Sequence, residues 1–251
     1  MNKILVWDIP TRLFHWAFAA SLTGAIAIGF LTDDDAPLFM THMLLGIVAV
    51  FLLIMRLVMG LVGSRYARFG SFPLSPRGMA VYFVSAVFSK TKRYAGNNPG
   101  SALAAVLMFL LVLALFITGA GIGGGEVGEI HETLAWALLV VVALHIAGLV
   151  LHTIRHRESI GLSMITGKKS GEPADAIPSS HPVWGVAFAL AATAWIGGLF
   201  ANHDANTTSV RLPLIGASVR LGENEGEEHG RGESRHSERG RHREDDDDDD
   251  D

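Results

Sequence analysis

The 251-residue chain contains no cysteine. It can therefore form no disulfide, has no thiolate ligands for an iron–sulfur cluster and lacks the C-x-x-C-H motif that attaches haem covalently. Any metal-containing cofactor must be held by other side chains, such as His or Met.

Charged residues are scarce as well. They make up 18% of the chain, against 49% hydrophobic residues, and the mean hydropathy is +0.34. This composition is typical of a small helical membrane protein that is surrounded by lipid and binds no nucleic acid. The charges are also unevenly divided: residues 1–202 carry 13 Lys+Arg and 10 Asp+Glu, whereas residues 203–251 carry 7 and 15.

The chain contains several long apolar segments with few charged residues. A helix needs about 20 apolar residues to cross the hydrocarbon core of a bilayer. Four segments meet this requirement, and a fifth at 183–201 is shorter and richer in Ala and Gly but contains no charged residue. We expect an all-α protein, a transmembrane four-helix bundle followed by a fifth transmembrane helix. The first four spans lie at 11–31, 41–62, 99–120 and 129–154.

The pattern divides the chain into four parts. A four-helix domain covers 1–169, a linker with three prolines covers 170–182, the fifth helix covers 183–201, and an acidic low-complexity tail covers 202–251. The tail ends in seven consecutive aspartates, and such a composition favours disorder. Residues 77–89 are too short to span, and we expect a helix there that lies along the membrane surface.

Basic residues predict the orientation. The connections at 32–40 and 121–128 contain no Lys or Arg, whereas the connection at 63–98 contains six and residues 155–169 contain four. Connections rich in Lys and Arg stay in the cytoplasm. We therefore expect a multi-pass protein of the bacterial inner membrane, with a cytoplasmic N-terminus and, beyond the fifth helix, a periplasmic acidic tail.

Four histidines lie in the predicted spans: His15, His42, His131 and His145. An ionisable side chain is costly inside a bilayer and calls for a reason. His131 and His145 lie 14 residues apart on one helix, so they point within about 40° of each other and are separated by about 21 Å along the axis. His42 lies near an outer helix end, as His131 does, and His15 lies at a depth similar to that of His145. The sequence thus predicts two level pairs, His42 with His131 and His15 with His145.

Two neutral imidazoles on facing helices are what an axially ligated haem iron needs. Gly46 and Gly148 follow His42 and His145 by about one turn, and they provide either room for a flat porphyrin or close packing between helices. A single intramembrane His is more often a hydrogen-bonded structural residue, but two level-matched pairs favour ligation. The main alternative for the inner ligand is His152.

Four segments of the sequence resemble the bacterial cytochrome b-561 family, which includes the b-type cytochrome subunits of nickel–iron hydrogenases. Together they cover about residues 4–168. The first segment combined with the 14-residue His spacing is the specific part of this resemblance, whereas the apolar parts alone are weak. The segments are VWDIPTRLFHWAF, HMLLGIVAVFLLIMRLVMGLVGSRYARF, GNNPGSALAAVLMFLLVLALFITG and HETLAWALLVVVALH.

The resemblance implies a four-helix bundle that holds two non-covalent b haems, each between two histidines. Carried over residue by residue, the ligands are His15, His42, His131 and His145, the same four residues that the depth argument selects. It further implies electron transfer across the membrane between the quinone pool and a redox partner, either a periplasmic cytochrome c or a membrane-attached oxidoreductase. The protein would then be an electron carrier and a component of a quinol/quinone oxidoreductase.

The chain departs from the family at two places. Family members often read Gly-His-Asn-Pro where this chain has Gly96-Asn97-Asn98-Pro99, and the region after about residue 170 lies outside the resemblance. The missing His is not one of the paired ligands, so we expect haem ligation to survive its loss.

Several arginines near the predicted inner face allow two interpretations. They pair with haem propionates or they anchor the protein on lipid head groups, and the second is favoured for each residue taken singly. These arginines are Arg12, Arg56, Arg65 and Arg68.

Two other functions stay open. A metal-ion transporter would use the intramembrane histidines as ligands, but it needs them close together or joined by acids, and here they form two groups about 21 Å apart. A membrane anchor without redox function would dock another subunit and would leave the paired histidines unexplained.

Overall fold

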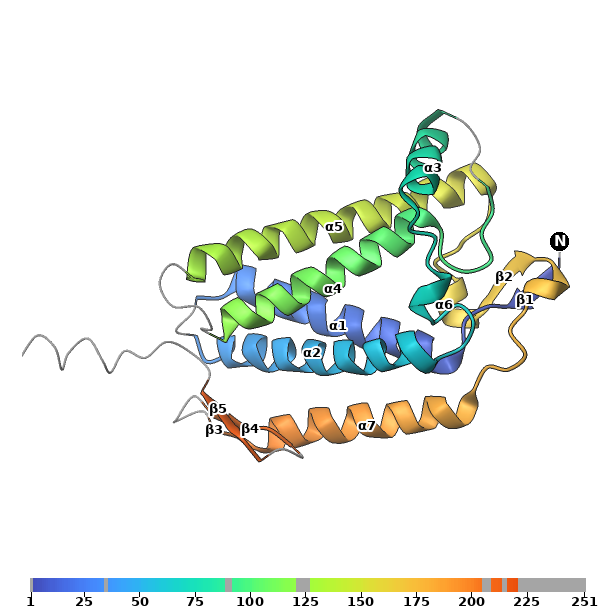
Figure 1. Cartoon of the computed structure of the whole chain (residues 1–251). Helices are drawn as coiled ribbons and strands as arrows, with labels where there is room; N and C mark the ends of the chain where they lie inside the picture. The colour runs from blue at the N-terminus through green and yellow to red at the C-terminus, as the bar shows by residue number, and fades with distance from the viewer. Residues whose placement is uncertain are drawn as a thin grey trace, which may run out of the picture. The chain divides into compact units, whose positions relative to one another are not determined.

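The computed structural model describes residues 2–33, 36–88, 92–120, 127–204, 209–213 and 216–220. Within this part of the chain, five helices are long and apolar enough to cross a membrane. Each covers one of the five predicted spans, so the predicted helical membrane bundle is confirmed (Figure 1). The helices are α1 (Ile9–Leu31), α2 (Phe39–Val62), α4 (Pro99–Gly119), α5 (Val127–His156) and α7 (Pro182–Ala201).

Shorter elements connect or flank the spanning helices. The helical ones are η1 (Phe69–Ser71), α3 (Pro76–Phe88), α6 (Ser163–Thr166) and η2 (Pro173–Asp175). The strands are β1 (Asn2–Leu5), β2 (Lys168–Gly171), β3 (His203–Asp204), β4 (Ser209–Arg211) and β5 (Ser218–Arg220).

Two spanning helices begin at a capping side chain that is followed by a proline in the first turn. The Oδ1 atom of Asp8 accepts a hydrogen bond from the Thr11 amide at 2.9 Å at the start of α1. At the start of α4, Oδ1 of Asn98 accepts one from the Ser101 amide at 2.8 Å. Each cap satisfies an amide that has no partner inside the helix, and proline fits there because it brings no such amide.

The turn before α4 has a packing role as well. A Cβ at Gly96 would lie 2.4 Å from Cδ1 of Tyr66, so only glycine lets the backbone approach this ring. The Gly96 carbonyl accepts a hydrogen bond from Nζ of Lys169 at 3.0 Å. The Gly-Asn-Asn-Pro sequence therefore positions the start of α4 through Gly96 and Asn98.

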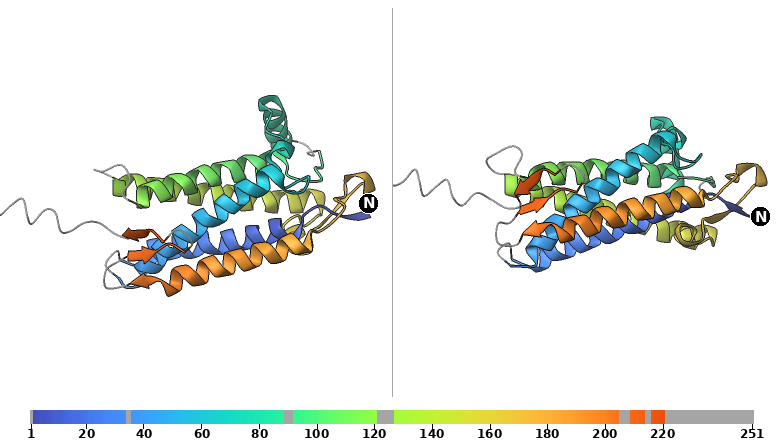
Figure 2. Two further views of the ribbon diagram at one scale, coloured as in Figure 1. Left: turned by 60° about the horizontal axis from the view of Figure 1, so that its bottom comes forward. Right: turned by 90° about the horizontal axis from the view of Figure 1, so that it is seen from below.

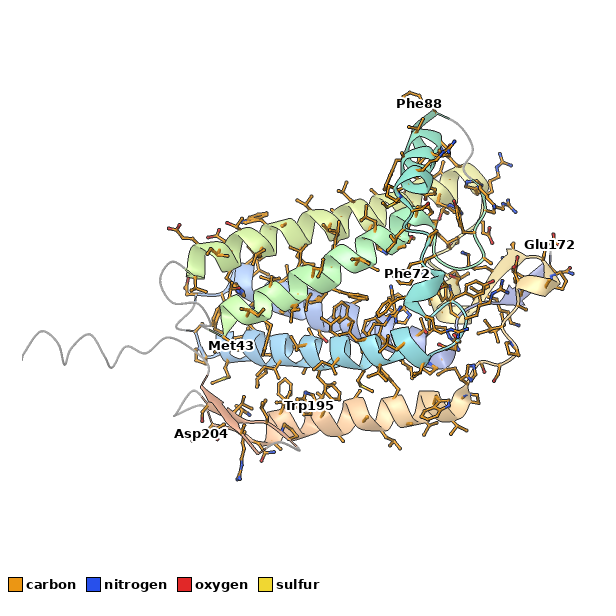
Figure 3. The ribbon with its side chains drawn as sticks, viewed as in Figure 1. Met43, Phe72, Phe88, Glu172, Trp195 and Asp204 are labelled. Atoms are coloured by element: carbon orange, nitrogen blue, oxygen red, sulfur yellow. The ribbon has the colours of Figure 1, made fainter. Side chains whose placement is uncertain are left out.

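The spanning helices are arranged as two antiparallel pairs, α1 with α2 and α4 with α5, which meet where α2 contacts α4. The fifth helix, α7, packs on α1 and α2, away from the α4–α5 pair (Figure 2). Its Trp195 lies between α7 and α2 (Figure 3) and stacks on Phe51 with ring centres 4.4 Å apart. Buried Phe188 and Leu199 extend the same contact.

One end of the bundle carries a small folded unit, the end cap, made of residues 2–8 and 158–177. Its strands β1 and β2 pair antiparallel, with Asn2 opposite Gly171 and Leu5 opposite Lys168. The Ile177 amide also donates to the Leu5 carbonyl at 2.9 Å. Strand pairing and an apolar cluster therefore order residues 170–177 within the segment that the sequence predicts to be a linker. The cluster contains Ile4, Val6, Trp7, Tyr66 and Ile177.

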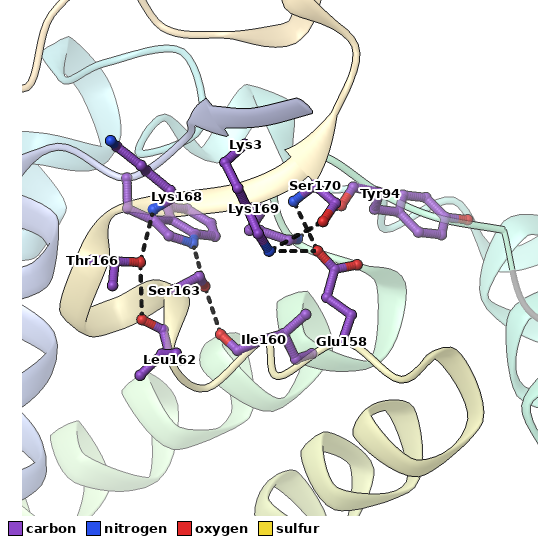
Figure 4. Close-up of polar contacts among 11 residues, drawn as sticks. Lys3, Tyr94, Glu158, Ile160, Leu162, Ser163, Thr166, Lys168, Lys169 and Ser170 are labelled. Atoms are coloured by element: carbon purple, nitrogen blue, oxygen red, sulfur yellow. Dashed lines mark hydrogen bonds and ion pairs between the residues drawn. The ribbon is translucent and has the colours of Figure 1, made fainter. Parts of the chain in front are cut away.

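Polar contacts hold the end cap together, and others fasten it to the rest of the protein (Figure 4). The Ser170 amide donates to Oε1 of Glu158 at 2.8 Å, and Nζ of Lys3 lies 4.0 Å from the same oxygen. Nζ of Lys169 is buried and donates to the carbonyls of Tyr94 at 2.8 Å and Gly96 at 3.0 Å. Lys169 thus ties β2 to the turn that precedes α4.

Beyond α7, three short strands form a second sheet in the order β3-β4-β5. Gly216, at φ +69°, lies in the turn between β4 and β5, a conformation that favours glycine. The start of the segment predicted as a tail therefore carries strands at residues 203–204, 209–211 and 218–220. A Ser-Val-Arg alternation occurs twice there and suits paired strands. The remaining tail, 221–251, lies outside the described residues.

The predicted surface helix at 77–89 is present as α3. It runs across the direction of the spanning helices in both Figure 1 and Figure 2. Val81, Val84 and Phe88 expose more than half of their surface. Exposed apolar side chains on a helix in this orientation suit a position along the membrane surface.

Burial of Lys169 makes the stability of the end cap depend on pH. Burial lowers the pKa of this ammonium group to about 8, and the charge of Glu158 opposes that shift. Between this value and about 10.5, the unfolded state binds the proton and the folded state does not, so folding becomes more favourable as the pH rises. The free energy of unfolding therefore rises across this pH range, and we expect Lys169→Met to reduce that rise by up to about 3 kcal/mol.

The measurement is the thermal unfolding midpoint in detergent from pH 7.5 to 10. Exposed Lys168 provides the matched control, and Lys168→Met should keep the wild-type pH dependence. Parallel curves for wild type and Lys169→Met would contradict the prediction.

Candidate functional site

The four histidines lie on three helices: His15 on α1, His42 on α2, and His131 and His145 on α5. Each predicted pair therefore joins the α1–α2 pair to the α4–α5 pair. A cofactor held by both members of a pair would lie between the two halves of the bundle.

The rings of His42 and His131 lie close to each other. Their ring centres lie 6.1 Å apart, with an interplanar angle of 71°. This separation suits two imidazoles on opposite sides of one metal ion, given metal–nitrogen bonds of about 2.0–2.1 Å. The structure thus brings the predicted outer pair together.

The hydrogen bond of His42 determines which ring nitrogen is available. Its Nδ1 lies 2.8 Å from the carbonyl oxygen of Ala25 on α1. A carbonyl can only accept, so Nδ1 carries the proton and Nε2 keeps its lone pair. Such a bond on the far side of a ligating imidazole orients the ring and raises its basicity.

His131 is oriented in the same way by α4. Its Nδ1 lies 3.0 Å from Oγ1 of Thr118, and that hydroxyl lies 3.0 Å from the Ala114 carbonyl and 3.1 Å from the Leu115 carbonyl. The single hydroxyl proton is donated to these carbonyls, so the oxygen accepts from Nδ1–H of His131. Its Nε2 is therefore also free to bind a metal.

His15 and His145 lie within electrostatic range of each other. Nδ1 of His15 is buried and has no hydrogen-bond partner among the described residues. Its ring stands edge-on to Trp16, with centres 5.1 Å apart. A buried imidazole nitrogen without a protein partner is uncommon.

Glycines shape the surroundings of the rings. A Cβ at Gly46 or Gly148 would meet no described atom within 4 Å, so close helix packing is not the role of either. Gly29 and Gly119 have the opposite property, because a Cβ at either would lie 3.0 Å from Cε1 of His42 or His131, respectively. The first two face open space, which would suit a flat porphyrin, and the other two let the rings lie against the neighbouring helix.

Sequence reasoning missed the residues that orient the rings, namely Ala25, Gly29, Thr118 and Gly119. A backbone carbonyl leaves no mark in a sequence. The Thr118-Gly119 pair at the end of an apolar segment was the one available signal, since a Thr hydroxyl and a glycine there can serve a ring on the next helix.

Residues considered as alternatives are engaged elsewhere. The His152 ring stacks on His156 with centres 4.3 Å apart. Arg12 donates to the Ile165 carbonyl at 2.6 Å, and Arg65 forms an ion pair with Asp175 at 3.7 Å.

The donor set fits a haem better than a bare cation. Among the described residues there is no group of three or more His, Cys, Asp or Glu side chains that could hold a metal ion. A structural or catalytic zinc ion takes three or four protein ligands, whereas a haem iron already has its porphyrin nitrogens and needs two axial ligands. Facing imidazoles therefore fit axial ligation of haem.

A helical membrane bundle with two close imidazoles from separate helix pairs fits the class of membrane b-type cytochromes. The chain is a member of the prokaryotic cytochrome b561 family, whose model matches residues 6–167. It is an integral inner-membrane protein that binds b-type haem and takes part in electron transfer.

The chain is also similar to proteins named as b-type cytochromes. The chain is 25% identical over 217 residues to a "Probable Ni/Fe-hydrogenase B-type cytochrome subunit" of Rhizobium leguminosarum bv. viciae, covering 67% of this chain and 89% of that protein. It is 21% identical over 218 residues to a protein of the same name from Rhodobacter capsulatus, covering 67% and 82%. No solved structure matches significantly.

The contact between Gly29 and His42 can be tested by adding side-chain volume. Gly29→Val would push the His42 ring from its place, so we expect a lower haem-to-protein ratio in the purified protein. Gly197→Val is the matched control, because a Cβ at this position in α7 meets no described atom within 4 Å. Equal haem content in both variants, measured by optical spectroscopy, would contradict the assigned contact.

Proposed function

We propose that the protein holds two b haems, one between His42 and His131 and the other between His15 and His145, and transfers electrons across the membrane. The observation that carries this proposal is the facing of His42 and His131 at 6.1 Å, with both Nδ1 atoms hydrogen-bonded away from the gap.

The residues have distinct tasks in this proposal. Bound haem b supplies reversible one-electron chemistry. Ala25 and Thr118 hold the outer imidazoles in the tautomer that ligates through Nε2. The apolar spans exclude water and protons from the path between the two pairs, so that electrons pass alone.

The redox partners follow from the membrane position and from the relatives. We propose the quinone pool as one partner. The relatives named as hydrogenase B-type cytochrome subunits support a membrane-attached oxidoreductase as the other, and a periplasmic cytochrome c is the second candidate. The basic connections favour a cytoplasmic N-terminus and a periplasmic end of α7.

The rival functions explain less. A metal-ion transporter needs clustered ligands, and the described residues contain no such cluster. An anchor without redox function does not account for two imidazoles 6.1 Å apart whose Nδ1 atoms are both bonded to a neighbouring helix.

Removing one ligand should remove one haem. In wild type we expect about two low-spin b haems per chain, and His42→Ala and His145→Ala should each leave one. The measurement combines reduced-minus-oxidised spectra with the haem-to-protein ratio. His152→Ala is the control and should keep both haems. A single haem in wild type, or the loss of one in His152→Ala, would refute the pairing.

The orientation is testable with a reporter enzyme that is active only in the periplasm. A fusion after residue 205 should be active, because α7 carries the chain outward. A matched fusion after residue 157, beyond α5, should be inactive. Activity only in the second fusion would reverse the proposed orientation, and activity in neither would remove α7 from the set of spanning helices.

A further inference from the structure

Arg56 is the one described arginine that is buried, with 5% of its surface exposed. It lies on α2, inside an apolar span of 24 residues. A guanidinium group cannot lose its charge in a protein, and a buried charge is strongly unfavourable unless it is paired. Arg56 therefore requires a partner.

The described residues give Arg56 aromatic contacts but leave one of its donors without an acceptor. The guanidinium lies 4.8 Å from the ring centre of Phe69 and 5.9 Å from those of Phe14, Phe72 and Phe109. Aromatic faces attract the cation but accept few hydrogen bonds. Nη1 of Arg56 has no hydrogen-bond partner among the described residues.

Acidic side chains do not supply the missing acceptor. The structure shows two ion pairs among the described residues, and neither involves Arg56. Asp8 is the carboxylate that acts electrostatically on Arg56. Its Oδ1 atom is occupied by the Thr11 amide at the start of α1. Arg56 thus keeps one buried donor, Nη1, without an acceptor among the described residues.

The position of Arg56 points to the inner histidine pair. Arg56 follows His42 by 14 residues, the spacing that separates the two histidines of α5, so both side chains leave α2 in directions that differ by about 40°. Arg56 and His15 each lie six residues from the same end of the antiparallel α1–α2 pair. The ring that Arg56 contacts on α1, Phe14, precedes His15 in the chain.

We propose that Arg56 binds a propionate carboxylate of the haem held by His15 and His145; this inference depends on the proposed function. A carboxylate matches the fork of guanidinium donors. The cofactor would bring this anion to the depth of the inner pair, whereas lipid phosphates stay at the membrane surface. Arg12 and Arg65 are already bonded to protein groups, and Arg68 is exposed. Arg56 differs from all three because it is buried with an unpartnered donor.

The test compares haem with its dimethyl ester, in which both carboxylates are blocked. Haem release to excess apomyoglobin is followed for wild type, Arg56→Gln and Arg56→Lys, each reconstituted with either cofactor. With native haem, Arg56→Gln should release one of the two haems about tenfold to a hundredfold faster, and Arg56→Lys should restore much of the retention. With the ester, Arg56→Gln should release that haem no faster than wild type.

A second readout is the pH dependence of the midpoint potential. In Arg56→Gln, an unpaired propionate should take up a proton near neutral pH, so the potential of one haem becomes pH-dependent and that of the other does not change. The ester should abolish this dependence. Arg65→Gln is the control, and both potentials should match wild type.

The outcomes separate the two proposals. Faster release from Arg56→Gln with both cofactors would mean that Arg56 stabilises helix packing or binds a lipid phosphate. That result would overturn the inference. Unchanged release with native haem would overturn it as well. If Arg56→Gln does not fold, the wild-type protein is compared with each cofactor instead. At one of the two sites, the ester should then be released faster than native haem. A wild type without two haems would refute the proposed function itself.

Discussion

The hydrocarbon core of a bilayer supplies no water, so each polar group inside the spanning helices must find its partner in the protein or in a bound molecule. Most polar atoms in this bundle meet the requirement locally, as Ser21 does by donating to the Ala17 carbonyl at 2.7 Å. The histidines and Arg56 are different, because their side chains reach between helices. Their side-chain atoms that lack a protein partner define the candidate haem sites.

Different helices carry the histidine rings and orient them. Within each antiparallel pair, the earlier helix orients the ring carried by the later one: Ala25 of α1 holds His42, and Thr118 of α4 holds His131. Across the pairs, the rings face each other. One contact fixes the tautomer and the other forms the site, so neither pair of helices is sufficient alone.

Elements outside the family region stabilise one half of this arrangement. The fifth helix packs on α1 and α2 through Phe188, Trp195 and Leu199. The end cap joins the N-terminal strand to residues about 165 positions later in the chain, through β1 and β2. Both contacts hold α1, which carries His15 and supplies the carbonyl that orients His42.

Hydropathy alone predicts the five spans, and helical rise predicts two levels of histidine, because both are local properties of the chain. The sequence also selected Arg56 as one of four arginines without separating it from the others. Helix packing is needed to show that four phenylalanines enclose Arg56 and that residues 168–177 fold onto the N-terminus. It also shows that Gly46 and Gly148 face open space, whereas Gly29 and Gly119 contact rings. These features depend on which helices become neighbours and how they rotate against each other, and a backbone carbonyl such as that of Ala25 acquires its role only there.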